Sequence, residues 1–355
     1  MPVAAARVAV EEVAAAAAGA DRGGDTVNSI ANQSMKKTIS SILIAAAMIA
    51  VGSTAQVGTT YAAEAAKGTA KKTAAQKAYA TPEELFQALA NAAKTNDSKA
   101  LVSLLGAQGD SLVNSGDAVR DKQQAEGFAA SYADKHSITM DGDARATLVV
   151  GKDDWPMPIP AVKGARGWTL DTQAGARELL ARRIGQNELD AIQVAKAIVD
   201  AERDYASEDR NADGLREYTA RFVSSPGQKD GLYWPIKQGE PPSPLGPLAA
   251  FAASEGYKGK QGTPTPFHGY YYRLLTLQGK DAPGGARSYV AHGRMIGGFA
   301  LIAYPATYGN SGIMTFMVNN DGVVYEKDLG TNTVALARAI KTFNPDSTWS
   351  KVPGN

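Results

Sequence analysis

The sequence contains no cysteine among its 355 residues. This absence excludes disulfide bonds, thiolate metal sites and an anchor attached through a lipid-modified cysteine. Histidine is almost as scarce, with only His136, His268 and His292. That scarcity limits the metal and general-base chemistry that the chain can support. We therefore expect the fold to be held together by its hydrophobic core alone.

The chain also lacks an excess of charge of either sign, because its formal net charge is +1 at pH 7. Nothing in this balance favours nucleic acid or an anionic membrane surface as a partner. A protein or another envelope component is the expected partner. The length is sufficient for two ordinary domains.

The N-terminal region has the pattern of a secretion signal. Met35 is followed by two lysines and then by an apolar run over 39–51. The run is shorter than the about 20 apolar residues of a transmembrane helix. Small residues follow it, as they do before a signal cleavage site. The pattern predicts a signal peptide over 35–63, cleaved after Ala62 or Ala63.

The predicted signal indicates a periplasmic or secreted protein with no transmembrane span after cleavage. An uncleaved anchor and an ordinary buried helix are the alternatives. Residues 1–34 are interpreted as an over-called gene start or a disordered segment. The Ala/Lys-rich segment 64–80 is predicted to be a disordered linker.

Residues 81–171 are predicted to form an N-terminal module of helices followed by strands. Its first helix begins at Pro82, because Thr81 is a suitable N-cap and acidic residues follow in the first turn. Residues 155–160 contain three prolines, so they are expected to run as an edge or a loop. Further helices are expected over 98–105 and from 120 to about 135, and strands over 144–150, 157–162 and 167–171.

A long connecting helix is predicted over 172–208, because this stretch has no proline and its apolar residues recur at three- and four-residue steps. Residues 209–350 then form a C-terminal module of antiparallel strands. Asn320-Asp321-Gly322 is a strong signal for a tight turn within it. Strands are expected over 270–277, 295–304, 313–318 and 323–327, with a further one over 218–223 and a last helix over 333–341. The predicted fold class is α+β, with two modules joined by the long helix and the second sheet packed on it.

Five separate motifs stand out along the chain: DDWPMPIP at 153–160, RRIGQNEL at 182–189, FHGYYYR at 267–273, DAPGGA at 281–286 and MIGGFAL at 295–301. Together they resemble one exported bacterial family, catalogued as domain of unknown function 2950. The resemblance covers about residues 80–350. It implies export and a body in two parts, and it brings no established activity or catalytic residues.

The order of elements in the second half is weakly similar to the globular part of bacterial pseudopilins. A helix ends in an acidic, glycine-containing turn, and an antiparallel sheet follows that closes on 315–318 and 321–325. The hydrophobic pilin leader is absent from the sequence. The resemblance therefore implies a soluble pilin-like domain rather than a fibre subunit.

The best candidate for a metal site is the acidic loop 209–217. Its oxygen ligands fall at alternate positions and a glycine stands at the sixth, as in a calcium loop of the EF-hand type. Ala220 occupies the twelfth position, where that loop needs a bidentate glutamate. A helix end with an Asx turn and no metal is the alternative. The predicted Ca²⁺ ligands are Asp209, Asn211, Asp213, the Leu215 carbonyl and Glu217.

Ser311, in the turn Gly309-Asn310-Ser311-Gly312, superficially resembles a serine-protease nucleophile. A nucleophile needs a base within hydrogen-bond reach, and His268 and His292 are the candidates. The interpretation we favour is a turn before a strand. We therefore predict an exported envelope or periplasmic protein that binds a partner or assists surface assembly without catalysis. A periplasmic hydrolase acting on cell-wall or exported substrates is the alternative.

Overall fold

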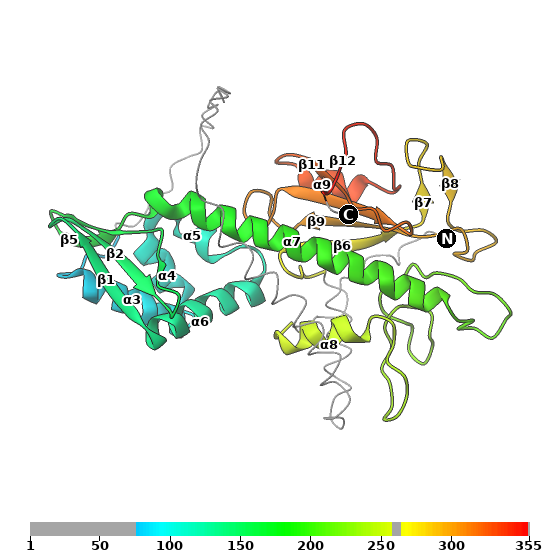
Figure 1. Ribbon diagram of the computed structural model, residues 1–355, viewed down its shortest axis with the longest axis horizontal. Helices are drawn as coiled ribbons and strands as arrows, with labels where there is room; N and C mark the ends of the chain where they lie inside the picture. Colours follow the sequence, from blue (N-terminus) through cyan, green and yellow to red (C-terminus); the bar gives the residue numbers. More distant parts are fainter. Residues whose placement is uncertain (1–75, 258–263, 354–355) are drawn as a thin grey trace.

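The computed structural model describes residues 76–257 and 264–353 (Figure 1). The predicted signal peptide, the segment before it and most of the predicted linker lie outside the described residues. No helix in the described part of the chain combines the length and the apolar character that a membrane crossing requires.

The described chain opens with a group of short helices. Thr81, Asp97 and Asp117 act as N-caps, because each side chain accepts a hydrogen bond from a backbone N–H of the first turn. The first two caps explain why their helices begin at the predicted positions, whereas the Asp117 cap starts the helix predicted from 120 at Ala118. The helices are α3 (Pro82–Lys94), α4 (Ser98–Leu105), the 3₁₀ turn η2 (Gly106–Gln108), α5 (Gly109–Val113) and α6 (Ala118–Asp134).

A small antiparallel sheet follows, in the order β1-β2-β4-β5, with β3 paired to β2. The strand predicted over 157–162 is wrong, since the proline-rich stretch leaves only β3 and a later β4. The sequence prediction also missed β1, a mostly exposed strand in which only Ile138 and Met140 alternate with polar residues. The strands are β1 (His136–Asp141), β2 (Arg145–Val150), β3 (Trp155–Pro156), β4 (Ala161–Gly164) and β5 (Gly167–Leu170).

The long helix is confirmed as α7 (Thr172–Ala206), 35 residues capped by Asp171. It joins the N-terminal part, which consists of the helices and the sheet before it, to the C-terminal part, which follows it in the chain (Figure 1). Near its start Gly175 lies so close to the Pro158 carbonyl that a Cβ would overlap it. Further along, Glu188 Oε1 accepts hydrogen bonds of 2.9 Å from two backbone N–H groups at the start of β10. The helix thereby packs closely on the proline-rich stretch and is hydrogen-bonded to the second sheet.

The second sheet is antiparallel, in the order β12-β11-β10-β9-β6, and contacts α7 through β9 and β10. The α+β fold class is thus confirmed. The predicted hairpin is present, and Gly322 has φ 82 in its turn, which favours glycine. The strands are β6 (Tyr270–Leu275), β9 (Ala300–Pro305), β10 (Met314–Asn319), β11 (Tyr325–Asp328) and β12 (Ser350–Lys351). The other elements of this part are α8 (Gly246–Ser254), α9 (Thr333–Ala339) and a ribbon of β7 (Leu277–Gln278) and β8 (Arg287–Ser288).

The strand predicted over 218–223 is wrong. The segment makes an isolated bridge between Val223 and Tyr233. Its other backbone bonds join Tyr218 to Met295, Arg221 to Leu232 and Phe222 to Tyr233. Aromatic and β-branched residues pack there without a neighbouring strand to complete a ladder. Local composition therefore favoured a strand that the tertiary structure does not form.

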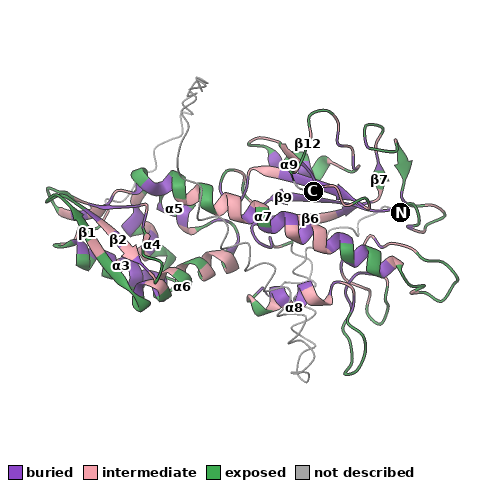
Figure 2. Cartoon of the chain, viewed as in Figure 1, coloured by how far each residue is buried: buried purple, intermediate pink, exposed green. Residues whose placement is uncertain are grey.

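The buried hydrophobic residues form two clusters (Figure 2). The smaller one lies among α3, α4, α6 and the first sheet, and α7 contributes Ala176 to it. The larger one surrounds the second sheet, and α7 contributes the stretch from Ala191 to Tyr205. One helix therefore anchors both cores.

Candidate functional site

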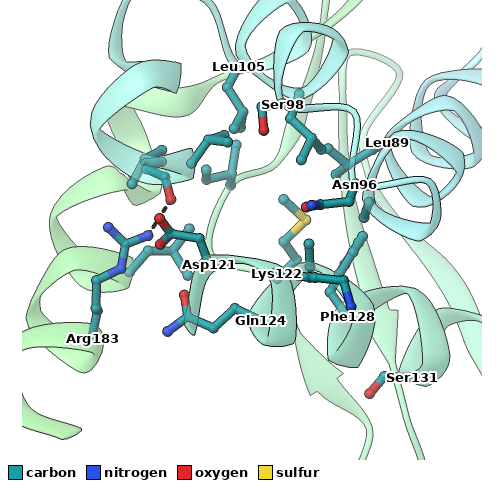
Figure 3. Close-up of a pocket in the computed structure, with 18 of the residues that line it drawn as sticks. Leu89, Asn96, Ser98, Leu105, Asp121, Lys122, Gln124, Phe128, Ser131 and Arg183 are labelled. Carbon is teal, nitrogen blue, oxygen red and sulfur yellow. Dashed lines mark hydrogen bonds between the residues drawn. The ribbon is translucent and has the colours of Figure 1, made fainter. Parts of the chain in front are cut away.

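A cavity of about 540 Å³ opens among α3, α4, α6, α7 and the proline-rich stretch of the first part (Figure 3). Its wall is mainly aliphatic and aromatic, and the volume falls within the range of small-molecule sites. The apolar lining includes Leu89, Leu101, Leu105, Phe128, Met157 and Ile159. Such a cavity suits an apolar ligand, because filling it removes apolar surface from water.

One end of the cavity is polar. Asp121 of α6 and Arg183 of α7 lie beside one another there (Figure 3). Asp121 Oδ2 accepts a hydrogen bond of 2.9 Å from the Ser115 N–H, whereas its Oδ1 is buried with no partner among the described residues. Burial raises the pKa of the Asp121 carboxyl, and the Ser115 hydrogen bonds and the charge of Arg183 offset part of that rise.

The Arg183 guanidinium is held mainly by carbonyl oxygens. Its Nη1 donates to the Ser111 carbonyl at 3.0 Å and to Asn310 Oδ1 at 2.7 Å, and its Nη2 donates to the Leu112 carbonyl. Burial lowers its pKa. Asn310 in turn donates to the Asn114 carbonyl at 3.0 Å. A residue from the C-terminal part therefore binds Arg183 and the backbone of Asn114 beside the polar end of the cavity.

A second polar cluster joins the two parts through Asp117. Its Oδ2 accepts hydrogen bonds of 2.9 Å from both the Tyr257 hydroxyl and the Gly269 N–H. Its Oδ1 accepts one of 3.1 Å from the Arg120 N–H at the start of α6. Burial and the Asp117 carboxylate raise the pKa of Tyr257, so this hydroxyl remains a donor. One buried carboxylate thus links the first helix group to the second sheet.

His268 lies in the same cluster, with φ 50. Its Nε2 is 2.7 Å from Glu255 Oε2, and its Nδ1 is 3.4 Å from Asp190 Oδ2. Asp190 also pairs with Arg120 at 2.9 Å. The side chain of His268 is 4% exposed and is not part of the cavity wall. The sequence singled out His268 but missed its acidic partners Asp190 and Glu255, because they lie on different helical segments far apart in the chain.

Ser311 is fully buried, and its hydroxyl is occupied by the backbone of a single turn. It accepts a hydrogen bond from the Thr307 N–H at 2.9 Å and donates to the Thr307 carbonyl at 3.2 Å. Within the described residues no hydrogen bond connects it to a histidine, and His292 is exposed elsewhere. The arrangement agrees with the interpretation of Ser311 as part of a turn before β10.

The five predicted calcium ligands lie in one exposed loop after α7. Asp209 accepts hydrogen bonds from the backbone N–H groups of Asn211, Asp213 and Gly214, at 3.2, 3.3 and 2.7 Å. These bonds, led by the one from Gly214, lower the pKa of Asp209. The Leu215 N–H binds Asp213 Oδ1 at 3.1 Å. The loop thus has the hydrogen bonds of an Asx turn.

Arg294 forms ion pairs with the other two carboxylates of this loop, those of Asp213 and Glu217. Its Nε lies 2.7 Å from Glu217 Oε2, and its Nη2 lies 3.2 Å from Asp213 Oδ1. Asn211 Nδ2 also donates to Glu217 at 2.8 Å. The described residues contain no cluster of three or more metal-binding side chains. Calcium binding at Asp209, Asn211, Asp213, Leu215 and Glu217 stays a prediction, and a cation there would have to compete with Arg294.

Replacing Arg294 with glutamine is expected to strengthen Ca²⁺ binding at this loop at least about tenfold, because it frees two carboxylates from an internal cation. Calorimetric titration with Ca²⁺ and the melting temperature in millimolar Ca²⁺ measure the effect. Arg216→Gln is the matched control, since Arg216 is exposed in the same loop. No heat and no thermal shift in either the wild type or the Arg294 variant would refute the prediction.

The comparisons with known proteins identify the family of this chain and assign no activity to it. The family described as protein of unknown function (DUF2950) matches residues 76–352. No curated protein and no solved structure gives a match. The likeness to pseudopilins therefore stays a prediction. Because the family match extends over well more than half of the sequence, this chain belongs to the family of proteins of unknown function DUF2950.

Proposed function

We propose that this is an exported, non-catalytic binding protein that holds an apolar ligand in the cavity of its N-terminal part. The observation that carries the proposal is the cavity of about 540 Å³ with its aliphatic and aromatic wall. The apolar wall of this open cavity is in contact with water, which is unfavourable. A ligand that fills the cavity removes both that wall and its own apolar surface from water.

The side chains at the cavity favour binding over chemistry. Ser98 and Ser131 are its hydroxyl-bearing residues, and no histidine is part of its wall. Nucleophilic catalysis needs a base within hydrogen-bond reach of the nucleophile, itself oriented by a third group. The charged residues of the wall, Asp121, Lys122, Asp153 and Arg183, provide no such group of three.

The exported part of the proposal is supported by the signal pattern that begins at Met35. Envelope compartments contain many molecules with long apolar parts, which need a carrier or a receptor in water. A binding protein of this kind fits a role in assisting surface assembly. Its partner is expected to be an envelope component or another protein.

A periplasmic hydrolase is the second candidate, and the pairing of His268 with Glu255 favours it. A histidine hydrogen-bonded to a carboxylate is the arrangement of many general bases. A substrate would have to reach a ring that is 4% exposed and stacked on Phe267. Binding in the open cavity requires no such rearrangement, and for that reason we rank it first.

Replacing Ala125 with tryptophan is expected to weaken the binding of an uncharged fluorescent probe, N-phenyl-1-naphthylamine, at least about tenfold, or about 1.4 kcal/mol. Ala125 lies on α6 in the cavity wall, so the indole would occupy the space of the ligand. Fluorescence titration measures the affinity. Ala130→Trp is the control, because Ala130 is exposed on the same helix and is not part of the wall.

Melting temperatures of both variants show whether the fold is retained. Saturable binding by the wild type and by Ala130→Trp, with loss in Ala125→Trp, would support the proposal. An absence of saturable binding by the wild type, or equal binding by the two variants, would contradict it.

A further inference from the structure

The polar end of the cavity contains a hydrogen-bond acceptor without a donor. Asp121 Oδ1 is buried and unpartnered among the described residues, while Oδ2 has the Ser115 N–H. A buried acceptor that has lost water and gained no partner destabilises the protein. A ligand that brings a donor to this oxygen would remove that penalty, so the site favours a donor.

The neighbouring cations do not turn this end into an anion site. Both Nη atoms of Arg183 are engaged by backbone carbonyls and by Asn310. Lys122 is exposed and pairs with Glu126 at 2.9 Å. A carboxylate head group would therefore meet the Asp121 carboxylate, while both N–H groups of Arg183 Nη1 are already engaged. Like charges at short distance in a partly buried site repel each other.

The residues of α6 that line the cavity follow one another along the helix axis. Asp121, Ala125 and Phe128 line the cavity at steps of four and three residues, so they share one face of the helix. Ser131 continues the wall at the end away from Asp121 (Figure 3). Seven to ten residues of helix rise about 10–15 Å. The wall therefore suits an elongated ligand with its head at Asp121.

We propose that the ligand is an amphiphile whose hydroxyl or amino head group donates a hydrogen bond to Asp121 Oδ1 while its apolar tail lies along α6. This inference rests on the proposed function of the cavity and assigns the chemistry of its ligand. Burial also raises the pKa of Asp121, as expected for a carboxyl group that is partly removed from water. The head group of a lipid and a free long-chain alcohol or amine share this chemistry.

The test uses three probes with the same ten-carbon tail: decanol, decylammonium and decanoate. Each displaces N-phenyl-1-naphthylamine from the full-length protein. We expect decanol and decylammonium to compete at concentrations at least about tenfold lower than decanoate. In Asp121→Asn the amide can donate to a carboxylate, so the ratio should fall to within about threefold while the fluorescent probe still binds. Asp134→Asn removes an exposed acidic side chain of the same helix that is not part of the wall, and should leave the ratio unchanged.

The outcomes separate the two proposals. If the fluorescent probe binds and Ala125→Trp abolishes its binding, but decanoate competes as well as the donors, the head-group assignment is wrong and the cavity function stands. A donor preference that persists in Asp121→Asn overturns the assignment in the same way. If no probe binds the wild type, both proposals fail. Vesicles containing lipids with amino head groups, compared with free decylammonium, distinguish a membrane source from a soluble one.

Discussion

Replacing Asp117 with alanine is expected to lower the free energy of unfolding by at least about 3 kcal/mol. The substitution removes the N-cap of α6 and leaves the Tyr257 hydroxyl and the Gly269 N–H buried without an acceptor. A lost cap costs about 1 kcal/mol, and each unsatisfied buried donor about 1–3 kcal/mol. Urea unfolding followed by circular dichroism measures the change.

Asp97→Ala is the matched control for this experiment. Asp97 caps α4 through the Ala100 N–H at 3.0 Å but is exposed and makes no bond to the C-terminal part. Its loss should cost only about 1 kcal/mol. Equal losses of unfolding free energy in the two variants would mean that Asp117 stabilises the protein only as a helix cap, without a contribution from its bonds to Tyr257 and Gly269.

The link between the two parts is isolated by combining Asp117→Ala with Tyr257→Phe. The two side chains are joined directly, so the double variant should be more stable than the sum of the single losses predicts, by about 0.5–3 kcal/mol. Strict additivity would argue against a bond that holds the parts together. A broadened or two-step unfolding curve of Asp117→Ala would show that the parts have become uncoupled.

Replacing Glu202 with glutamine is expected to stabilise the protein at neutral pH and to change how its stability depends on pH. Glu202 lies on α7 with 0% exposure, and its one hydrogen bond comes from the Thr219 N–H at 3.1 Å. Its Oε1 has no partner among the described residues. Burial raises the pKa of this carboxyl well above its ordinary value of 4.5, and the Thr219 hydrogen bond offsets only part of the rise.

The direction of the pH effect follows from proton binding. Between the unfolded and the folded pKa, the folded state binds more protons than the unfolded state, so the stability falls as pH rises. The fall attributable to Glu202 begins near pH 4.5 and amounts to about 1.4 kcal/mol per pH unit until the folded pKa is reached. Glutamine does not titrate, so the variant should lose this slope.

Urea unfolding of the wild type and Glu202→Gln at several pH values from 4 to 8 tests this prediction. The difference in stability between the two proteins should grow in favour of the variant as pH rises. Asp200→Asn is the control, because Asp200 is exposed on the same helix and pairs only with Arg203. A constant difference across this range would show that Glu202 keeps an ordinary pKa in the folded protein.

Much of the secondary structure could be read from local patterns. Thr81 and Pro82 mark the start of α3, and the proline-free stretch with helical periodicity marks α7. The turn before Gly322 marks the β10–β11 hairpin. These signals are local, because caps, turns and periodicity depend on neighbouring residues. The exposed β1 has only a short alternation of apolar and polar residues. The irregular segment 218–223 has the composition of a strand but does not form one.

The candidate sites were harder to predict, because they depend on residues far apart in the chain. Asp117 meets Tyr257 and Gly269 across 140 and 152 positions. Arg183 was part of a recognised motif, yet its contact with Asn310 across 127 positions could not be inferred from that motif. The cavity gave no sequence signal, since the residues of its wall have the composition of an ordinary core.

The sequence by itself determined that this protein has no thiol chemistry, few histidines, a pattern for export and an α+β order of elements around one long helix. It did so because composition and short-range periodicity are properties of the chain alone. Only the tertiary structure decided that His268 lies between two carboxylates, that Arg294 takes the carboxylates of the acidic loop, and that α6 lines a cavity with an unpartnered acceptor at one end. Those features arise where separate elements pack together, and packing is set by the shape of the whole fold.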